Sequence, residues 1–255
     1  MKTALITGAS SGIGKETAFV YAKNNYNLIL VARRLEKLNQ IKAKIQTTYN
    51  VKVTVINMDL SVLNAAESLY KKINDLDIKI DVLINNAGFG LHGNFIDEDS
   101  QKQEQMLVLN MITLTKLCQL FAKDMIKNKG GNIVNIASAA AYQPVPSLAT
   151  YSATKSYVLN FSEAIAFELK SKNVLVTAIC PGATQSEFGV VAGFSENADF
   201  FKKIPTAKEL ANFIFKAMQR KKTSTIHGFK NWFLAFSGRF APRKLTTYIA
   251  YKVIN

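Results

Sequence analysis

Short apolar runs that alternate with segments of helical periodicity constrain the fold of this chain more than any other feature of its sequence. Six runs have the length and composition of buried strands, and they cover residues 2–7, 27–32, 51–57, 80–84, 132–137 and 174–180. A seventh run, 223–226, is expected at a sheet edge. Segments between them repeat apolar residues at helical spacing, as at Leu35, Leu38, Ile41 and Ile45. This alternation predicts an α/β fold with a doubly wound parallel sheet of about seven strands and helices on both faces.

One domain, residues 1–255, accounts for the whole sequence. A chain of this size buries roughly three quarters of its unfolded surface, so it needs no disulfide or metal for stability. Cys118 and Cys180 stand in apolar stretches and are expected to be reduced and buried. His92 and His227 lie far apart, and we expect no metal site. We also expect neither a signal peptide nor a membrane span, and hence a cytoplasmic location.

Six residues lie just past the carboxyl ends of the expected strands, and a parallel sheet would bring them to one edge. They are Gly8, Arg33, Asp59, Asn85, Ser138 and Pro181. Ligands of doubly wound sheets bind beyond the carboxyl ends of the strands. The pattern therefore predicts a single ligand cleft built from six segments of the chain.

A glycine-rich turn with Gly8, Gly12 and Gly14 links the first strand to the first helix. Glycine lets the backbone approach a pyrophosphate closely, and the N-terminus of a helix favours its negative charge. The spacing departs from the usual G-x-G-x-x-G fingerprint, but the place after the first strand favours dinucleotide binding. The alternative is a plain tight turn.

Two arginines, Arg33 and Arg34, follow the end of the second strand at Ala32. Sites that take NAD usually carry Asp or Glu near this position, where it binds the ribose 2′-hydroxyl. Arginine instead binds a 2′-phosphate by bidentate, charge-assisted hydrogen bonds. We therefore predict a preference for NADP over NAD, with Arg33 as the main contact. The alternative is an exposed basic start of the second helix.

Tyr151 and Lys155 stand four residues apart, so a helix would place both side chains on one face. A free phenol has a pKa of about 10 and transfers protons poorly at neutral pH. A cation about 4 Å away is worth roughly 4 kcal/mol in a partly screened site, or about three pKa units. The spacing therefore predicts a tyrosine whose pKa is lowered toward about 7 and which acts as an acid or base. The alternative is a packed tyrosine beside a solvated lysine.

Taken together, these motifs resemble the short-chain dehydrogenase/reductase family. The residues that carry the resemblance span positions 3 to about 186, and they are Thr7-Gly-Ala-Ser-Ser-Gly-Ile-Gly14, Asn85-Asn-Ala-Gly88, Asn110, Ser138, Tyr151-x-x-x-Lys155 and Pro181-Gly182. The resemblance implies a Rossmann-like domain, a nicotinamide cofactor, and hydride transfer between that cofactor and a carbonyl or alcohol. It also implies a homodimer or homotetramer.

The resemblance implies roles for four catalytic residues. Tyr151 would be the acid or base, and Lys155 would lower its pKa and hold the nicotinamide ribose. Ser138 would hydrogen-bond the substrate carbonyl, and Asn110 would steady a water molecule connected to Lys155. The implied cofactor contacts are Gly8, Ser10, Ser11, Gly12, Ile13, Gly14, Arg33, Arg34, Asp59, Leu60, Asn86, Ala87, Gly88, Tyr151, Lys155, Pro181, Gly182, Thr184 and Ser186. Ser186 departs mildly from the family, where threonine is more usual.

Residues 185–205 are rich in phenylalanine and correspond to a mobile substrate lid in the family that the chain resembles. A lid of this composition would favour an apolar substrate, and the alternative is a separate hydrophobic cluster. His92 follows the Asn85–Gly88 turn and either faces the substrate or is an ordinary loop residue. The candidate substrate contacts are Ser138, Tyr151, His92 and Phe188.

The chain carries 32 Lys and Arg against 18 Asp and Glu, a net charge of +14, which favours anionic partners. No acidic residue follows Glu209, and the extension at 228–255 mixes aromatic rings with lysine and arginine. Such a segment can pack on the domain, complete a dimer interface or lie on an anionic membrane surface. Packing or dimerisation is the stronger expectation. No motif supports a nucleic-acid partner.

The leading prediction is an NADP-dependent oxidoreductase that transfers hydride between NADPH and an apolar carbonyl or alcohol. A 3-oxoacyl-carrier-protein or 3-oxoacyl thioester reductase is the alternative among enzymes, because the basic surface would suit an acidic carrier. However, residues 139–146 do not resemble the Gly- and Gln-rich segment typical of carrier-protein reductases. A non-catalytic, NADP-binding redox sensor is the alternative of another class. Such a sensor would not need the complete set of Asn110, Ser138, Tyr151 and Lys155.

Overall fold

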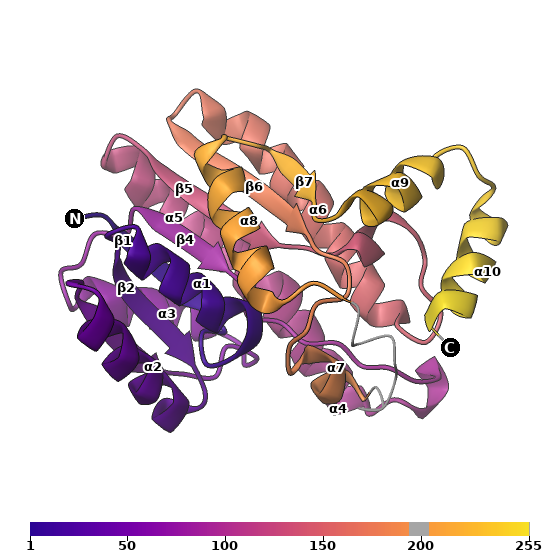
Figure 1. Ribbon diagram of the computed structural model, residues 1–255, viewed down its shortest axis with the longest axis horizontal. Helices are drawn as coiled ribbons and strands as arrows, with labels where there is room; N and C mark the ends of the chain where they lie inside the picture. Colours follow the sequence, from indigo (N-terminus) through magenta and orange to yellow (C-terminus); the bar gives the residue numbers. More distant parts are fainter. Residues whose placement is uncertain (194–203, 255) are drawn as a thin grey trace.

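A computed structural model describes residues 1–193 and 204–254, which form a seven-stranded sheet flanked by helices (Figure 1). The strands are β1 (Thr3–Thr7), β2 (Asn27–Ala32), β3 (Val53–Asn57), β4 (Val82–Asn85), β5 (Gly131–Ile136), β6 (Val174–Cys180) and β7 (Ser224–Ile226). Their order is β3-β2-β1-β4-β5-β6-β7, and every neighbouring pair is parallel. The expected fold class is confirmed, and β7 lies at an edge of the sheet as predicted.

Helices connect the strands. They are α1 (Gly12–Lys23), α2 (Leu35–Thr48), α3 (Ala65–Asn74), α4 (Ser100–Leu107), α5 (Leu114–Lys127), α6 (Ala149–Lys170), α7 (Phe188–Ala192), α8 (Ala207–Gln219), α9 (Phe229–Ser237) and α10 (Arg243–Ile254). Two short 3₁₀ helices, η1 (Phe95–Asp97) and η3 (Ala139–Tyr142), lie in loops, and η2 (Val108–Thr113) is π-helical.

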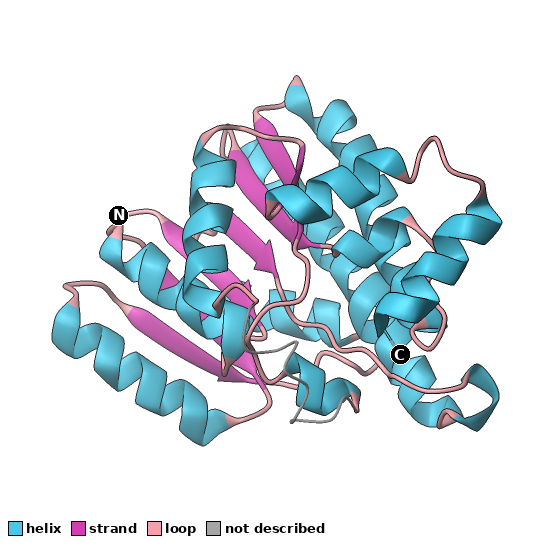
Figure 2. Cartoon of the chain, turned by 45° about the vertical axis from the view of Figure 1, so that its right-hand side comes forward, coloured by secondary structure: helices cyan, strands magenta, loops and turns pink. Residues whose placement is uncertain are grey.

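Both faces of the central strands are buried, which explains why β1, β2 and β4 are largely apolar runs. Successive strand residues point to opposite faces. Leu5 packs with α3, α5 and α6 on one face, whereas its neighbour Ile6 packs with α1, α2 and α8 on the other. Figure 2 shows these helices in front of the sheet and behind it.

The direction of the strand order reverses at β1, which pairs with β2 on one side and with β4 on the other. In doubly wound sheets this reversal opens a crevice beyond the carboxyl ends of the strands. Gly8, Asn86 and Ser138 follow β1, β4 and β5, so the fold brings these segments to the same edge.

The long helical segment between β4 and β5 is divided in the structure. α4 and α5 are joined by η2, whose wider π-helical turn contains Asn110. By length and composition alone, Ser100–Lys127 could cross a membrane. However, 50% of its most apolar stretch of 18 residues is buried inside the domain. Leu117 and Phe121 of α5 pack in the core under the sheet, so we assign this stretch as a core helix.

α9 and α10 form an arm (residues 229–254) beyond β7, which projects from the domain on the right of Figure 1. α9 contacts η3 and β7. Within the arm, Ala235 and Ala250 are the buried residues. The aromatic rings of this extension are largely exposed in the single chain, and its packing or dimerisation stays a prediction.

Candidate active site

The turn after β1 has a backbone conformation that favours glycine at two positions. Gly8 and Gly12 have φ angles of +66° and +50°, in the left-handed region. A Cβ on Gly8 would lie 2.8 Å from the Asn86 amide nitrogen, and one on Gly14 would collide with the carbonyl oxygen of Gly8. The Ser11 side chain does not cap α1, and the first turn of α1 has no acidic residue. The N-terminus of α1 thus presents N–H groups to an anionic ligand.

Asn86 braces this turn from the end of β4. Its Nδ2 donates to the carbonyl oxygens of Thr7 at 2.9 Å and Gly8 at 3.2 Å. The Thr7 hydroxyl oxygen accepts the backbone N–H groups of Asn86 and Ala87, both at 3.0 Å. The Asn86 amide, which was predicted to line the cofactor, therefore fixes the backbone of the glycine turn.

Arg34 lies across the same turn. Its Nε and Nη2 donate to the Ser10 hydroxyl at 3.2 and 3.0 Å, and its Nη2 donates to the Ser11 hydroxyl at 2.7 Å. Glu187, at the start of α7, accepts from Arg34 at 2.7 Å and from Lys37 at 2.9 Å. Burial raises the pKa of Glu187, but the hydrogen bonds from Lys37 and Arg34 outweigh it and lower that pKa to about 2. Sequence analysis missed Glu187, because an acidic residue far along the chain gives no signal of this pairing.

Arg33 has a different environment from Arg34. Its side chain is 66% exposed, and its nearest guanidinium nitrogen lies 3.8 Å from an Asp59 carboxylate oxygen. Asp59 itself accepts the backbone N–H of Ser61 at 2.9 Å and the Ser61 hydroxyl at 2.7 Å. Because a loose, exposed ion pair contributes little, Arg33 can exchange Asp59 for a phosphate at small cost.

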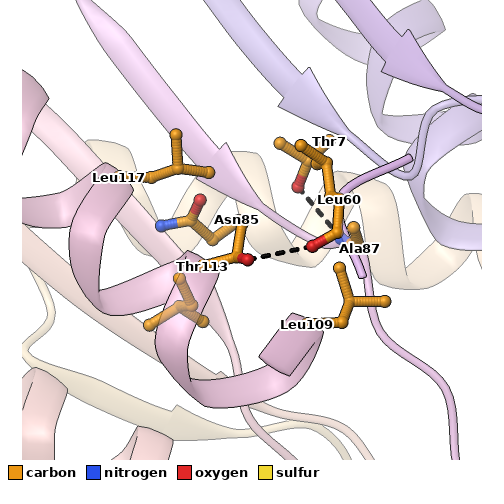
Figure 3. Close-up of a pocket in the computed structure, with 8 residues that line it drawn as sticks. Thr7, Leu60, Asn85, Ala87, Leu109, Thr113 and Leu117 are labelled. Carbon is orange, nitrogen blue, oxygen red and sulfur yellow. Dashed lines mark hydrogen bonds between the residues drawn. The ribbon is translucent and has the colours of Figure 1, made fainter. Parts of the chain in front are cut away.

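Leu60 lies beneath the turn with its side chain buried. Its carbonyl oxygen accepts the Thr113 hydroxyl at 2.9 Å. Figure 3 shows Leu60, Thr7, Asn85 and Thr113 around an internal cavity of about 10 Å³. A cavity of this size holds at most about one water molecule, so it is not the substrate site. The predicted cofactor contact of Leu60 stays a prediction.

Tyr151 and Lys155 share a buried face of α6, as their spacing predicts. The Lys155 ammonium donates to the carbonyl oxygen of Ile136 at 2.8 Å and lies 5.7 Å from the centre of the Tyr151 ring. Ser138 caps η3 by accepting the N–H of Ala140 at 3.1 Å, and its hydroxyl lies near enough to the Tyr151 phenol to lower the pKa of that phenol. The structure thus brings together a phenol, an ammonium and a hydroxyl from two segments.

Asn110 is buried in η2 and holds two segments of the site together. Its Nδ2 donates to the Phe89 carbonyl oxygen at 3.0 Å and to the Thr154 hydroxyl at 3.1 Å. Its Oδ1 accepts the Phe89 N–H at 3.3 Å. Thr154 in turn donates to the Tyr151 carbonyl oxygen at 2.7 Å. Thr154 is therefore a supporting residue that sequence analysis missed, although it lies inside the Tyr-x-x-x-Lys motif.

Gly88 borders both Asn110 and Lys155. A Cβ at Gly88 would lie 3.0 Å from Asn110 Oδ1 and 3.5 Å from Lys155 Nζ. The amide oxygen and the ammonium therefore face the same point beside this glycine. This is the arrangement that a water molecule between Asn110 and Lys155 would require, and that water stays a prediction.

The pKa of Tyr151 moves in the opposite direction to the prediction. Burial raises the pKa of the phenol to about 12, and the hydrogen bond with Ser138 offsets only part of this rise. Burial also lowers the pKa of Lys155 to about 8. The prediction of a phenol with a pKa near 7 is wrong for this arrangement, because Lys155 donates to Ile136 and desolvation of a phenolate outweighs charge attraction. Tyr151 is consequently protonated at neutral pH, which is the form that donates a proton.

Apolar side chains line the rest of the space around Tyr151. The ring centre of Phe188 lies 5.2 Å from that of Tyr151. A Cβ on Gly90 would lie 3.0 Å from Phe188 and 3.1 Å from Tyr151, so glycine leaves room for both rings. Other members of this cluster are Phe89, Leu91, Met106, Val145, Leu148, Ala250 and Ile254. Ala250 and Ile254 belong to α10, so the C-terminal helix contributes to the same apolar cluster as Tyr151.

The segment that follows β6 passes over the glycine turn. It contains the predicted cofactor contacts Pro181, Gly182, Thr184 and Ser186. A Cβ on Gly12 would lie 3.0 Å from the Cβ of Ser186, so these two segments touch. A Cβ on Gly182 would collide with the side chain of Asn231 in α9, which explains the glycine at this position. Ile13, beside Gly12, packs into the core that lies under α1.

His92 lies against α7, where its backbone N–H donates to the Ala192 carbonyl oxygen at 2.8 Å. The structure thus places His92 next to the predicted lid, and its contact with substrate stays a prediction. α7 forms part of the predicted lid at 185–205. Residues 194–203 of that lid lie outside the described residues.

The chemistry of this cleft fits a phosphorylated dinucleotide. The glycine turn, the N-terminus of α1 and the exposed Arg33 all favour anionic groups. Lys155 adds a buried cation next to Tyr151. Within the described residues, no group of three or more His, Cys, Asp or Glu side chains could hold a metal ion.

Comparisons with known proteins agree with this geometry. Residues 2–193 match the family model described as short chain dehydrogenase. The chain is 33% identical over 262 residues to a very-long-chain 3-oxoacyl-CoA reductase of Pyrenophora tritici-repentis, covering 96% of this chain and 74% of that protein. It is 31% identical over 264 residues to human 17-beta-hydroxysteroid dehydrogenase type 3, covering 99% and 83%. A solved short-chain dehydrogenase from Sphingobium yanoikuyae, in complex with NADPH, is similar with a TM-score of 0.85, 30% identity and 94% coverage of each chain.

Fold and site together define an α/β oxidoreductase that acts on CH–OH or C=O groups. The chain belongs to the short-chain dehydrogenase family. The predictions of family, fold class and enzyme class are confirmed.

Proposed function

We propose that this protein is an NADP-dependent carbonyl reductase or alcohol dehydrogenase with a bulky, apolar substrate. The proposal rests on one observation. Ser138, Tyr151 and Lys155 lie close together beside Gly88 and the glycine turn. Asn110 stabilises this arrangement by hydrogen bonds to Phe89 and Thr154. A protein that only bound a dinucleotide would not need a buried phenol and a buried ammonium side by side, because burying either without a function is costly.

NADP, rather than NAD, is the cofactor that the residues after β2 favour. Arg33 is exposed and loosely paired, so its guanidinium is available to a 2′-phosphate. Arg34 already binds the hydroxyls of Ser10 and Ser11, which places a second cation over the phosphate-binding turn. The relative from Sphingobium yanoikuyae binds NADPH, which supports the same assignment.

The chain's own residues supply proton transfer and charge stabilisation, while NADPH supplies the hydride. Ser138 and Tyr151 hydrogen-bond the substrate carbonyl oxygen, on which negative charge develops during reduction. Tyr151 donates its proton to that oxygen, and burial keeps this proton on the phenol until the charge appears. The Lys155 ammonium, fixed by Ile136, then stabilises the phenolate that remains.

The apolar wall sets the class of substrate. Phe188 and the α10 residues Ala250 and Ile254 surround Tyr151 with hydrocarbon surface and offer no charge to a polar substrate. Two relatives act on large lipid-like molecules, as their names state: a very-long-chain 3-oxoacyl-CoA and a hydroxysteroid. We infer a ketone or secondary alcohol within a similarly large hydrocarbon framework.

A 3-oxoacyl thioester reductase is the second candidate. It is favoured by the similarity to the very-long-chain 3-oxoacyl-CoA reductase and by the net charge of +14, which would attract an anionic coenzyme A or an acidic carrier. It requires the same catalytic residues, so the two candidates differ in the substrate, which is a ketone in a hydrocarbon framework in one case and a 3-oxoacyl thioester in the other.

We also propose that the chain is a cytoplasmic homodimer or homotetramer assembled through its long helices. Support comes from large apolar side chains that these helices expose, such as Phe167 of α6 and Ile112 of η2. Their burial against a second copy would stabilise the assembly.

The experiment is a substrate panel followed by the loss of NADPH absorbance. It compares bulky apolar ketones, 3-oxoacyl-CoA thioesters and sugars, with a Tyr151→Phe variant as the blank. We expect bulky ketones or thioesters to be reduced at least about tenfold faster than sugars. A folded protein that binds NADPH but reduces none of them would contradict the proposal and support the redox sensor.

A further inference from the structure

The arm formed by α9 and α10 exposes far more apolar surface than a helix of this composition normally does. Phe229, Trp232, Phe233, Leu234, Phe236 and Phe240 are between 45% and 78% exposed. A helix that is apolar around most of its circumference is usually buried on all sides. Within the described residues of α9, Ala235 is the only one buried. The arm therefore lacks a partner for its outer surface.

Four of these rings follow one another in a row along the arm, the first three stacked and the last edge-on. The ring centres of Phe229 and Trp232 are 5.7 Å apart, those of Trp232 and Phe236 are 5.4 Å apart, and those of Phe236 and Phe240 are 5.4 Å apart. A preformed row of rings presents its apolar face with little loss of side-chain entropy on binding. The row is thus a ready contact surface rather than a loose tail.

Basic residues lie beside this apolar surface. Lys230, Arg239, Arg243, Lys244 and Lys252 are exposed, and the chain contains no Asp or Glu after Glu209. Aromatic and aliphatic side chains flanked by lysine and arginine are the composition of helices that lie in the interface of an anionic membrane.

The charge of the arm indicates which partner covers its apolar surface: its own domain, a second copy of the chain or a membrane. The domain does not cover the aromatic rings of the arm, because these rings are exposed. A symmetric dimer through the arm would bring the same five cations of both copies together, with no carboxylate in the arm to compensate them. An anionic lipid surface compensates the cations and buries the rings at once. We propose that the arm docks on the surface of a bilayer that contains anionic lipids.

Docking would place the bilayer next to the active site. Ala250 and Ile254 of α10 pack in the cluster around Tyr151, while Tyr248 and Ile249 of the same helix are 60% and 46% exposed. α10 therefore has one face on the active-site wall and another on the docking surface. An apolar molecule dissolved in the membrane would meet this wall without crossing water.

Trp232 is the only tryptophan of the chain, and it lies in the row of rings. Its fluorescence therefore reports on the arm alone. We would titrate the full-length protein with vesicles of phosphatidylcholine, and with vesicles of phosphatidylcholine and phosphatidylglycerol. The anionic vesicles should shift the Trp232 emission to shorter wavelength, lipids with brominated acyl chains should quench it, and the protein should sediment with the vesicles. The neutral vesicles should bind at least about tenfold more weakly.

Two triple variants test the two components of the surface. Phe229→Ser, Phe233→Ser and Phe240→Ser remove exposed rings, and Lys230→Glu, Arg239→Glu and Lys244→Glu invert exposed charges. Each should weaken vesicle binding at least about tenfold. The controls are Val62→Ser, Leu63→Ser and Leu76→Ser, which are exposed apolar residues elsewhere, and Lys44→Glu, Lys71→Glu and Lys127→Glu, which change the net charge equally. Both controls should bind like the unchanged protein.

Three results would overturn the proposal. The first is no binding to either kind of vesicle, and the second is equal binding to both kinds. The third is an oligomeric state, measured by light scattering without lipid, that the ring variant alone disrupts, since a second copy would then cover the arm. None of these measurements uses turnover, so the docking proposal can fail while the proposed enzyme activity stands.

Discussion

The Lys155 ammonium lies 5.7 Å from the centre of the Tyr151 ring, and both groups are buried in α6. At this distance the cation is attracted to the ring, while its proton is donated to the Ile136 carbonyl oxygen at 2.8 Å. Burial of the pair disfavours the charged form of each side chain. It therefore raises the pKa of Tyr151 and lowers that of Lys155. The pair is therefore prepared for a reaction in which Tyr151 loses its proton only as negative charge develops on the substrate.

The burial of Lys155 makes stability depend on pH. Its pKa is about 8 in the folded protein and 10.5 in its ordinary state, so between these values the unfolded chain binds one more proton. The free energy of unfolding should therefore rise by about 2 to 3 kcal/mol from pH 7 to pH 10 through this one group. Urea denaturation of the unchanged protein and of Lys155→Met at both pH values measures the difference. Other titrating groups are common to both proteins, so an equal change with pH in the two would show that Lys155 is not a buried cation.

Arg33 is predicted to select the 2′-phosphate of NADP. Arg33→Asp should raise the Kd for NADPH at least about tenfold and change the Kd for NADH little, because the lost contact is a charge-assisted one. Fluorescence titration with each cofactor provides the measurement. Lys23→Asp, at the exposed end of α1, changes the net charge equally and is the matched control. Equal weakening of NADPH and NADH binding would show that Arg33 does not select the 2′-phosphate.

Much of the fold could be predicted because its strands are buried on both faces. Such strands are continuous apolar runs, and β1, β2 and β6 lie within the predicted ranges. The motifs and the family that they resemble then predicted that Gly8, Ser138, Tyr151 and Lys155 lie in one cleft at the carboxyl ends of the strands.

Other features depend on burial and on contacts between distant segments, which the sequence does not display. The direction of the Tyr151 pKa follows from desolvation, and the partner of Arg34 is Glu187, which lies 153 residues further along the chain. Ala250 and Ile254 look like ordinary apolar positions, yet they join the apolar cluster that contains Tyr151. The sequence left the exposure of the arm open, because a segment of aromatic and basic residues suits a packed, a dimeric or a membrane-bound position equally.

Ala250 is predicted to limit the size of the substrate. Ala250→Phe adds a ring to the cluster that contains Tyr151, Val145 and Leu148, so it should exclude large molecules. The value of kcat/KM should fall at least about tenfold for a bulky ketone and change less for a small one, since a pocket discriminates by the volume it leaves. The Kd for NADPH should stay the same, which separates a narrowed pocket from a damaged fold. Equal losses for both ketones would remove α10 from the substrate site.

The central claim is that Tyr151 donates the proton to the substrate, and Tyr151→Phe tests it most directly. Phenylalanine keeps the ring that packs on Phe188 and removes only the hydroxyl that meets Ser138. The decisive measurement is kcat for reduction of the best ketone of the panel, with NADPH binding measured on the same sample. We predict a kcat lower by roughly 10²- to 10⁴-fold with the Kd for NADPH within about twofold of the unchanged protein. A kcat close to that of the unchanged protein would contradict the account.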